Sequence, residues 1–391
     1  MRVQIVDPSA YTPPYDDALC RALAAADVAV ELVTSRFAYG TVPPPCGYTR
    51  REHFYRLAHR EAAGGPRSRA RLALKAAEHV PDMLRYRRVA RAADVVHFQW
   101  LTMQPLDVHL LPPRRPPAAR PKRVLTAHDV LPREPRPGQL SAQRRLYERM
   151  DAVVVHTEHG RRRLCEELGL AKELVHVIPH GVLRPWEGEA AGDLPLELRR
   201  VEGPVVLFMG LLRPYKGLDV LLAAWQAVAA ETGRTGTGAA ELWIVGMPRM
   251  DIVPLRAAAQ AAERAGSGRV RLVPRFVSDA EIRALMCRAS LLVAPYREIE
   301  QSGVVLTALG AGKPLLLSDA GGFPEIAASG AARTMRAGDA RALADALREL
   351  LGDPALLDAM ATHARAAASG KYSWGAVAQA HLRLYERVLS Q

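Results

Sequence analysis

Two stretches of the chain, 205–217 and 293–325, constrain its fold most, because each joins a short apolar run to a helical pattern through a turn of small or polar residues. The first run, Val-Val-Leu-Phe-Met, ends at Gly210, and the second stretch places Ser302-Gly303 before its helical pattern. A buried strand that leads into a helix is the repeating unit of a doubly wound parallel sheet. The amino terminus of such a helix leaves unpaired N–H groups that suit a phosphate group. The two stretches therefore predict an α/β fold with an anion site.

Charged side chains flank both turns. Arg213 and Lys216 follow the first turn, and a diphosphate leaving group would use two such cations. Glu298 and Glu300 precede the second turn, and carboxylates accept hydrogen bonds from sugar hydroxyls. A phosphate at one edge of a cleft and a polyol at the other describe a nucleotide-sugar site.

The length of 391 residues allows two domains, each with its own core. Strand patterns at 2–6 and 28–34, with a helical pattern from Asp17 to Ala26 between them, open a first doubly wound sheet. The predicted organisation is a first domain over 1–185, a linker over 186–203 and a second domain over 200–370. An amphipathic helix over 374–391 closes the chain.

The sequence lacks the motifs that are typical of several classes of cofactor and partner. The loop 7–16 has no Gly-x-Gly-x-x-Gly, so a dinucleotide cofactor is not expected. No RNP, zinc-finger or helix-turn-helix pattern supports a nucleic-acid partner. No Asp-x-Asp is present to hold a metal, so neither a metal nor a cofactor is expected. Four scattered cysteines have no metal-ligand spacing and are expected to be reduced: Cys20, Cys46, Cys165 and Cys287.

The chain reads as a cytoplasmic enzyme, since it shows neither an apolar run of the roughly 18 residues that a spanning helix needs nor a signal peptide. Its net charge of +12 fits phosphorylated substrates or an anionic membrane surface. Residues 50–91 hold twelve Arg and Lys against four Asp and Glu. Two interpretations stay open: a pair of surface helices with a solvated arginine face, or an interfacial helix that holds the enzyme at the inner membrane surface.

The order of the motifs resembles that of the family-4 retaining glycosyltransferases of GT-B fold. The motifs are the Gly210 turn with Lys216, Pro-Tyr-x-Glu-x-Glu-Gln-Ser-Gly at 295–303 and Gly-Gly-x-Pro-Glu at 321–325. The resemblance covers nearly the whole chain. It implies two Rossmann-like domains that face each other across a cleft, with the C-terminal helix crossing back to the first domain. It also implies metal-independent, retaining transfer of a hexosyl unit from a UDP- or GDP-type sugar to a small-molecule, glycan or glycolipid acceptor.

On the donor side, the resemblance assigns catalytic roles to Lys216 and Glu300, with Glu298 as the alternative to Glu300, and Arg213 is a further catalytic candidate. Two positions depart from the family pattern: Leu211 stands where the arginine usually follows the turn glycine, and Thr307 stands where a second glutamate usually grips the ribose. The predicted donor-binding set is Gly210, Arg213, Lys216, Gly246, Met247, Arg275, Glu298, Glu300, Gln301, Ser302, Gly303, Val304 and Thr307.

On the acceptor side, His128 ends a strand pattern and resembles the family histidine that lies against the transferred sugar, so it completes the catalytic set. His97 is more plausible as a structural residue. Pro13-Pro14-Tyr15 replaces the usual Gly-Gly pair of the first loop, which leaves the role of this loop open. The predicted acceptor-side residues are Tyr15, Gln99, Trp100, His128 and Asp129.

Two alternatives compete with glycosyl transfer. A phosphorylase or sugar-phosphate synthase on the same fold would use phosphate or a phosphosugar at the acceptor position, and Arg161, Arg162 and Arg163 would help it if they faced the cleft. A non-catalytic sugar or nucleotide binder would explain Leu211 and Thr307. The donor sugar, the base and the acceptor are not readable from the sequence.

Overall fold

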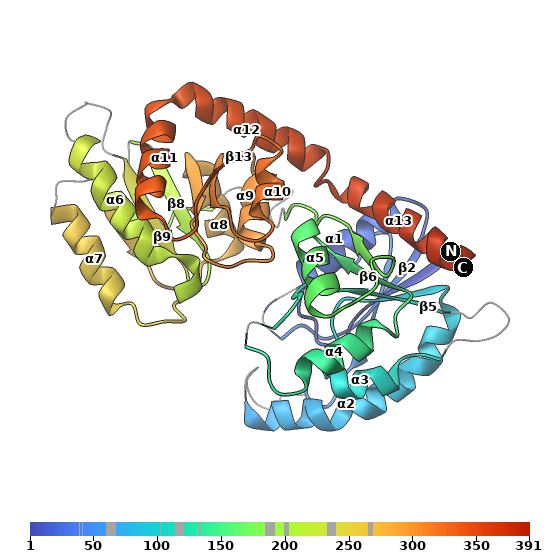
Figure 1. The fold of residues 1–391 in the computed structure, drawn as a ribbon. Coiled ribbons are helices and arrows are strands. Elements are labelled where there is room, and N and C mark those ends of the chain that lie inside the picture. Colours follow the sequence, from blue (N-terminus) through green and yellow to red (C-terminus); the bar gives the residue numbers. More distant parts are fainter. Residues whose placement is uncertain are drawn as a thin grey trace. The chain divides into compact units, whose positions relative to one another are not determined.

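The computed structural model describes residues 1–38, 40, 42–59, 68–101, 103–113, 121–132, 134–183, 192–198, 203–232, 240–264 and 269–391. The chain forms two compact units (Figure 1). Unit 1 comprises Met1–Gly181 and Trp374–Gln391, and unit 2 comprises Val182–Ser373. Most of the predicted linker 186–203 lies outside the described residues.

Unit 1 is built on a seven-stranded parallel sheet in the order β3-β2-β1-β4-β5-β6-β7. Side chains alternate between its two faces, so that Val3 and Ile5 join one core and Val6 joins the other. Helices α1 and α13 cover the first face, and α2, α3, α4 and α5 cover the second. The strands are β1 (Arg2–Asp7), β2 (Ala29–Ser35), β3 (Thr49–Phe54), β4 (Val95–Phe98), β5 (Lys122–Thr126), β6 (Ala152–Val155) and β7 (Val175–Val177). The helices are α1 (Pro13–Ala24), α2 (Arg69–Val89), α3 (Gln104–Leu110), α4 (Gln139–Tyr147), α5 (Glu158–Glu167) and α13 (Trp374–Ser390).

Helix α1 begins earlier than its hydrophobic pattern predicts. The sequence suggested a loop as far as residue 16, but the helix starts at Pro13. Proline suits the first turn of a helix, where its missing N–H is not needed and its fixed φ is already helical. Tyr15 and Asp16 are thereby held in the buried part of the first turn.

Over its described residues, the basic segment 50–91 forms a strand and a helix in place of a pair of helices. Its start belongs to β3, the edge strand of the sheet, where Phe54 is buried in the core. Its second half is the single helix α2, whose buried side chains include Met83 and Tyr86. Residues 60–67 lie outside the described residues, and the interfacial-helix interpretation stays a prediction.

Unit 2 is built on a six-stranded parallel sheet in the order β10-β9-β8-β11-β12-β13. Strand β8 is buried at every position, as expected for a parallel strand covered on both faces. Helix α6 packs against α7 and α11, and α9 packs against α12. The strands are β8 (Val205–Met209), β9 (Glu241–Val245), β10 (Val270–Val273), β11 (Leu291–Ala294), β12 (Leu315–Ser318) and β13 (Ala332–Met335). The helices are α6 (Leu218–Thr232), α7 (Val253–Arg264), α8 (Asp279–Arg288), α9 (Gly303–Gly310), α10 (Phe323–Ala327), α11 (Ala340–Gly352) and α12 (Pro354–Ser369), with short 3₁₀ turns η3 (Leu196–Leu198) and η4 (Pro214–Lys216).

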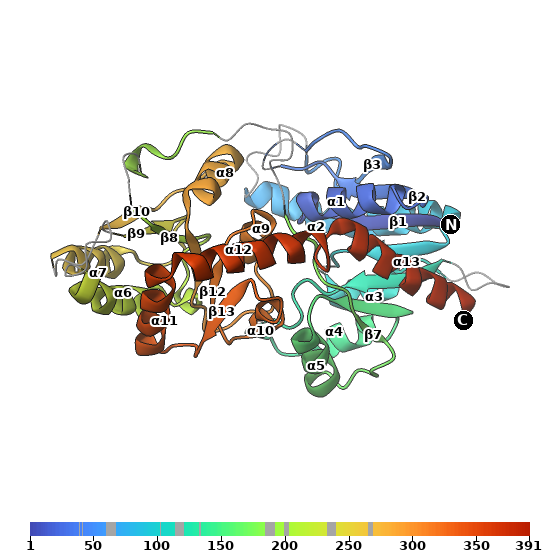
Figure 2. The same ribbon diagram turned by 90° about the horizontal axis from the view of Figure 1, so that it is seen from above.

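The last helix returns to unit 1, as the resemblance implied. Helix α13 lies alongside α1 (Figure 2) and places Val377, Tyr385 and Val388 in the core beneath it. Within the described residues, none of the helices combines the length and the apolar character needed to cross a bilayer.

Candidate functional site

In unit 2, the turn after β8 brings a glycine, a lysine and a helix amino terminus together. Gly210 has φ 124, a conformation that side chains rarely permit. A Cβ atom on Gly210 would lie 2.8 Å from the Lys216 Nζ and 3.2 Å from the Val304 Cγ2 at the start of α9. A Cβ atom on Gly246, at the end of β9, would collide with the Gly210 carbonyl. The absence of both side chains therefore lets the backbone and the ammonium group approach one another.

Lys216 carries a buried positive charge at this turn, with an exposed fraction of 7%. Its Nζ donates to the Tyr296 hydroxyl at 3.1 Å and lies 4.7 Å from the centre of the Tyr296 ring. Gly217 (φ 68) ends the η4 turn that carries the lysine. A buried ammonium group attracts an anion more strongly than an exposed one, because less water screens it.

The predicted residues 298–304 lie on the loop that follows β11 and on the first turn of α9. Ser302 is the N-cap of α9, and its hydroxyl accepts from the Val305 N–H at 3.4 Å. Gly303 is exposed, while Glu300 and Gln301 are partly buried and Glu298 is exposed. The free N–H groups of the first helical turn carry a partial positive charge that adds to that of Lys216.

The other predicted donor residues have different surroundings. Arg213 is exposed, and Thr307 is a buried residue within α9. Met247 is 36% exposed and its carbonyl accepts from the Leu212 N–H at 3.0 Å. Arg275 donates to Glu281 at 2.7 Å, which holds it against the amino end of α8 and, with Ser278, lowers the pKa of Glu281 to about 2.

In unit 1, polar side chains gather at the edge where the parallel strands end, which is where doubly wound folds bind ligands. Gln99 follows β4, His128 follows β5, and His156 follows β6. His128 is central: its Nε2 lies 3.0 Å from Gln99 Oε1, and its Nδ1 lies 3.3 Å from His156 Nε2. The Trp100 ring stacks on His128 with centroids 5.0 Å apart, and Tyr15 meets it edge-on at 4.8 Å. The predicted acceptor-side residues Tyr15, Gln99, Trp100 and His128 are therefore in contact, and Asp129 is exposed beside them.

Further histidines join this edge. His97 is fully buried and bonded on both nitrogens, to the Tyr385 hydroxyl and to Thr126 Oγ1, each at 2.7 Å, which is a structural arrangement. Burial and the neighbouring His156 lower the pKa of His180 to about 3. Among the described residues, His, Cys, Asp and Glu side chains form no group of three that could hold a metal ion.

Three further aromatic residues at this edge, His156, His180 and Trp374, were not predicted from the sequence. Tyr15 contacts all three rings, at centroid distances of 5.6, 4.7 and 5.1 Å. The available signal was position: His156 stands directly after a buried strand next to the one that His128 follows.

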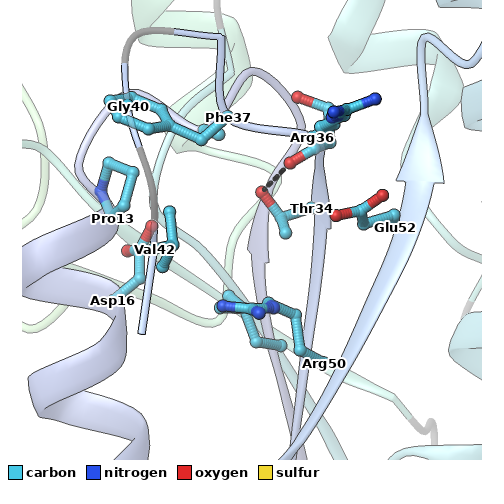
Figure 3. A pocket seen from close by; sticks show the side chains of 12 residues that line it. Pro13, Asp16, Thr34, Arg36, Phe37, Gly40, Val42, Arg50 and Glu52 are labelled. Atoms are coloured by element: carbon cyan, nitrogen blue, oxygen red, sulfur yellow. Dashed lines mark hydrogen bonds between the residues drawn. The ribbon is translucent and has the colours of Figure 1, made fainter. Parts of the chain in front are cut away.

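A cavity of about 260 Å³ opens at the same edge, beyond β2 (Figure 3). Asp16 and Ser35 line it, and within the described part of the chain the Oδ1 of Asp16 and the Oγ of Ser35 are buried without a hydrogen-bond partner. Buried polar atoms are nearly always bonded, so these two atoms mark a place for water or ligand. The remaining lining residues are Ala10, Pro13, Leu32, Thr34, Arg36, Phe37, Gly40, Val42, Arg50 and Glu52.

Arg36, which lines this cavity, also belongs to a group of cations around His59. Arg71 on α2 is 9% exposed, and its Nη2 lies 3.1 Å from His59 Nδ1. The Lys75 ammonium lies 4.9 Å from the centre of the Tyr55 ring. Burial, Lys75, Arg71 and Arg36 together lower the pKa of His59 to about 4. Arg36, Arg71 and Lys75 form no close ion pair with any residue that the structure describes, although the carboxylates of Asp7 and Glu78 act on Lys75 and His59.

Comparison with solved structures defines the class of fold. A sucrose-phosphate synthase from Thermosynechococcus elongatus matches 100% of this chain and 99% of its own, with a TM-score of 0.71 and 18% identity. The match to Anabaena HepE in complex with UDP-glucose covers 100% of this chain and 99% of HepE, with a TM-score of 0.68 and 18% identity. The two Rossmann-like units of this chain thus form the GT-B fold of glycosyltransferases.

Family matches go further than the fold. Residues 17–182 match Glycosyltransferase Family 4, and residues 203–353 match Glycosyl transferases group 1. A D-inositol 3-phosphate glycosyltransferase from Nocardia farcinica is 34% identical over 61% of this chain, and the matched part spans 53% of that relative. The chain belongs to the family-4 glycosyltransferases.

Proposed function

We propose that this protein transfers a hexosyl unit from a UDP- or GDP-type sugar to an acceptor hydroxyl, with retention of configuration and without a metal. The observation that supports it most is the buried Lys216 ammonium under the Gly210 turn, beside the amino terminus of α9. Anabaena HepE, which shares the fold, was solved in complex with UDP-glucose, and this supports a donor of the same kind.

The chemistry follows from where charge develops. The bond between the anomeric carbon and the diphosphate oxygen breaks, a bond to the acceptor oxygen forms, and the acceptor proton passes to the departing diphosphate. Negative charge grows on the diphosphate, so a fixed ammonium group and helix amides stabilise the transition state more than the ground state. Lys216 and the first turn of α9 supply these groups, and Glu300 on the preceding loop is the candidate partner for donor hydroxyls.

The acceptor in this proposal carries a phosphate group. Arg71, Lys75 and Arg36 form a positive cluster around His59, the carboxylates of Asp7 and Glu78 act on Lys75 and His59, and Arg36 also lines the 260 Å³ cavity. A polyol in the cavity and its phosphate against the cluster would satisfy both features. The names of two similar proteins, a D-inositol 3-phosphate glycosyltransferase and a sucrose-phosphate synthase, fit an acceptor of this kind.

Nucleotide binding tests the donor part. We expect UDP or GDP to raise the melting temperature of the wild-type protein, and Lys216→Met to lose that shift. Lys313→Met is the matched control, because Lys313 is a partly buried lysine of the same unit whose Nζ donates to the carbonyls of Cys287 and Ala289. If no nucleotide shifts the wild type, or if Lys216→Met responds like Lys313→Met, the donor proposal is wrong.

Acceptor competition tests the phosphate part. The nucleotide that stabilises the protein identifies the base of the donor. Nucleotide sugars with that base are then assayed for turnover with inositol 3-phosphate, with inositol, and with inorganic phosphate alone. We expect the phosphorylated polyol to be preferred and Lys75→Met to abolish the preference while retaining the nucleotide shift. Release of a sugar 1-phosphate with inorganic phosphate alone would instead support the phosphorylase reading. Product stereochemistry by proton NMR and turnover in EDTA test retention and metal independence.

A further inference from the structure

A row of hydrogen-bonding groups runs through unit 1 behind the candidate acceptor site. It comprises the Ile178 carbonyl, His156, His128 and the Gln99 amide. The Ile178 oxygen lies 3.0 Å from His156 Nδ1, His156 Nε2 lies 3.3 Å from His128 Nδ1, and His128 Nε2 lies 3.0 Å from the Gln99 side chain. The segments that follow four different strands, β4, β5, β6 and β7, supply these groups.

The carbonyl at one end decides where the protons sit. A carbonyl oxygen only accepts, so the proton of His156 lies on Nδ1. A neutral imidazole has one N–H, which leaves His156 Nε2 as an acceptor. His128 Nδ1 therefore donates to it, and His128 Nε2 carries a lone pair.

The opposite arrangement requires a buried cation. If His128 were protonated on Nε2, its Nδ1 would accept, and His156 would need protons on both nitrogens. Burial lowers the pKa of His156 to about 4, and burial together with His156, His180 and His97 lowers that of His128. A doubly protonated His156 is thus disfavoured at neutral pH.

The Gln99 side chain is compatible with this direction of hydrogen-bond donation. Its Nε2 is buried without a hydrogen-bond partner among the described residues, while its Oε1 faces His128. A half-turn of the amide about its Cγ–Cδ bond exchanges these atoms with almost no change of shape. The amide N–H then donates to the His128 lone pair, and every contact in the row joins a donor to an acceptor.

We infer that His156 is a positioning residue that holds His128 as the Nδ1–H tautomer, so that His128 meets a substrate hydroxyl as a neutral hydrogen-bond acceptor. The inference rests on the proposed function for the substrate, but its tautomer part does not. The stacked Trp100 ring leaves the Nε2 edge of His128 available, and Trp100 is held by its own bond to Thr12 Oγ1 at 2.9 Å. A substrate hydroxyl that reaches Nε2 would replace the Gln99 N–H.

Nitrogen-15 NMR of the histidine side chains reads the tautomer directly in the full-length protein at pH 7. We expect the wild-type His128 signals, identified by their loss in His128→Gln, to show a protonated Nδ1 and an unprotonated Nε2. His156→Phe should move His128 toward the Nε2–H form. His156→Gln, whose side-chain oxygen can accept from Nδ1, should restore it.

Activity supplies the second readout. We expect His156→Phe to lower kcat about tenfold or more, with nucleotide binding unchanged, and His156→Gln to recover part of the loss. His381→Phe is the matched control: His381 is a buried histidine of the same unit whose Nδ1 also bonds a backbone carbonyl, that of Val377 at 2.9 Å.

Two results would overturn the inference: a wild-type His128 protonated on Nε2, or a His156→Phe variant that keeps both the tautomer and the kcat. If His156→Phe does not fold, the wild-type spectrum and His156→Gln still decide. The NMR result needs no turnover, so it stands apart from the nucleotide-shift test of the proposed function.

Discussion

Gly210→Ala is the substitution that tests the donor site most directly. The new Cβ atom would lie 2.8 Å from the Lys216 Nζ, so the ammonium group has to move away from the turn. The backbone at φ 124 also becomes strained, because this region favours glycine. One change therefore affects both the stability of unit 2 and the position of a charge.

The two effects can be estimated separately. A side chain held at an unfavourable positive φ costs about 1–3 kcal/mol. An ammonium group about 4 Å from a phosphate charge interacts by about 4 kcal/mol at an effective dielectric of about 20, and by about 3 kcal/mol when it is about 2 Å further away. A loss of about 1.4 kcal/mol corresponds to roughly tenfold weaker binding.

A second glycine isolates the strain. Gly338 lies in the same unit at φ 79, and a Cβ atom there would meet no atom within 4 Å. We expect Gly338→Ala to lower the free energy of unfolding by about 1–2 kcal/mol without changing the nucleotide Kd. Gly210→Ala should lower it by about 1–3 kcal/mol and also weaken nucleotide binding about tenfold.

Calorimetry measures both quantities, by thermal unfolding and by titration with the nucleotide that stabilises the wild type. The reasoning fails if Gly210→Ala binds the nucleotide as tightly as Gly338→Ala does. If both variants bind the nucleotide more weakly than the wild type by the same factor, backbone strain alone accounts for the loss of affinity.

Three further predictions concern the framework around the two sites. Ser278→Ala removes the capping box of α8, in which Ser278 Oγ accepts from the Glu281 N–H, and should lower the free energy of unfolding by about 1 kcal/mol in urea titrations; an unchanged value would contradict the role of the cap. Burial lowers the pKa of His381 to about 4, so between pH 6.5 and 4 the unfolded chain binds a proton at this residue and the folded chain does not. The contribution of His381 to the free energy of unfolding is therefore full above pH 6.5 and falls by about 1 kcal/mol per pH unit below it. The fall with pH should be shallower in His381→Phe than in the wild type. Tyr385→Phe removes the hydroxyl that lies 2.7 Å from His97 Nδ1 and should lower the free energy of unfolding by about 1–3 kcal/mol. Tyr372→Phe should lower it less, because the Tyr372 hydroxyl donates over a longer distance, 3.3 Å, to the Glu325 carbonyl. Equal losses would contradict a larger contribution from the buried hydrogen bond of Tyr385.

Part of the sheet of unit 2 could be predicted from sequence, because strands such as β8 and β11 are short, wholly apolar runs between turn residues. Strand β3 could not, since it is an edge strand that reads Thr-Arg-Arg-Glu-His-Phe and buries mainly Phe54. Exposure of the remaining side chains makes such a strand look like a polar helix or loop. The early start of α1 at Pro13 was missed for a different reason: hydrophobic periodicity begins only after the first turn.

The candidate site shows the same division. His128 and Lys216 could be predicted, because each follows a clear strand in a motif that resembles the family. His156 and Trp374 have no local motif, and only the sheet order and the return of α13 bring them to Tyr15. Collecting the residues that directly follow each parallel strand would have found His156, but nothing in the local sequence points to Trp374.

The return of α13 to unit 1 has a consequence for synthesis on the ribosome. Unit 1 is interrupted in the chain, so translation must pass through the whole of unit 2 before α13 is made. Until then, the face of the first sheet that includes Val3 and Ile5 lacks the cover of Val377 and Tyr385. Domains fold as units during synthesis, and unit 2 has all its strands before unit 1 is complete. The half of the enzyme that is translated first is therefore the half that finishes folding last, and its nascent form exposes apolar surface until α13 is made.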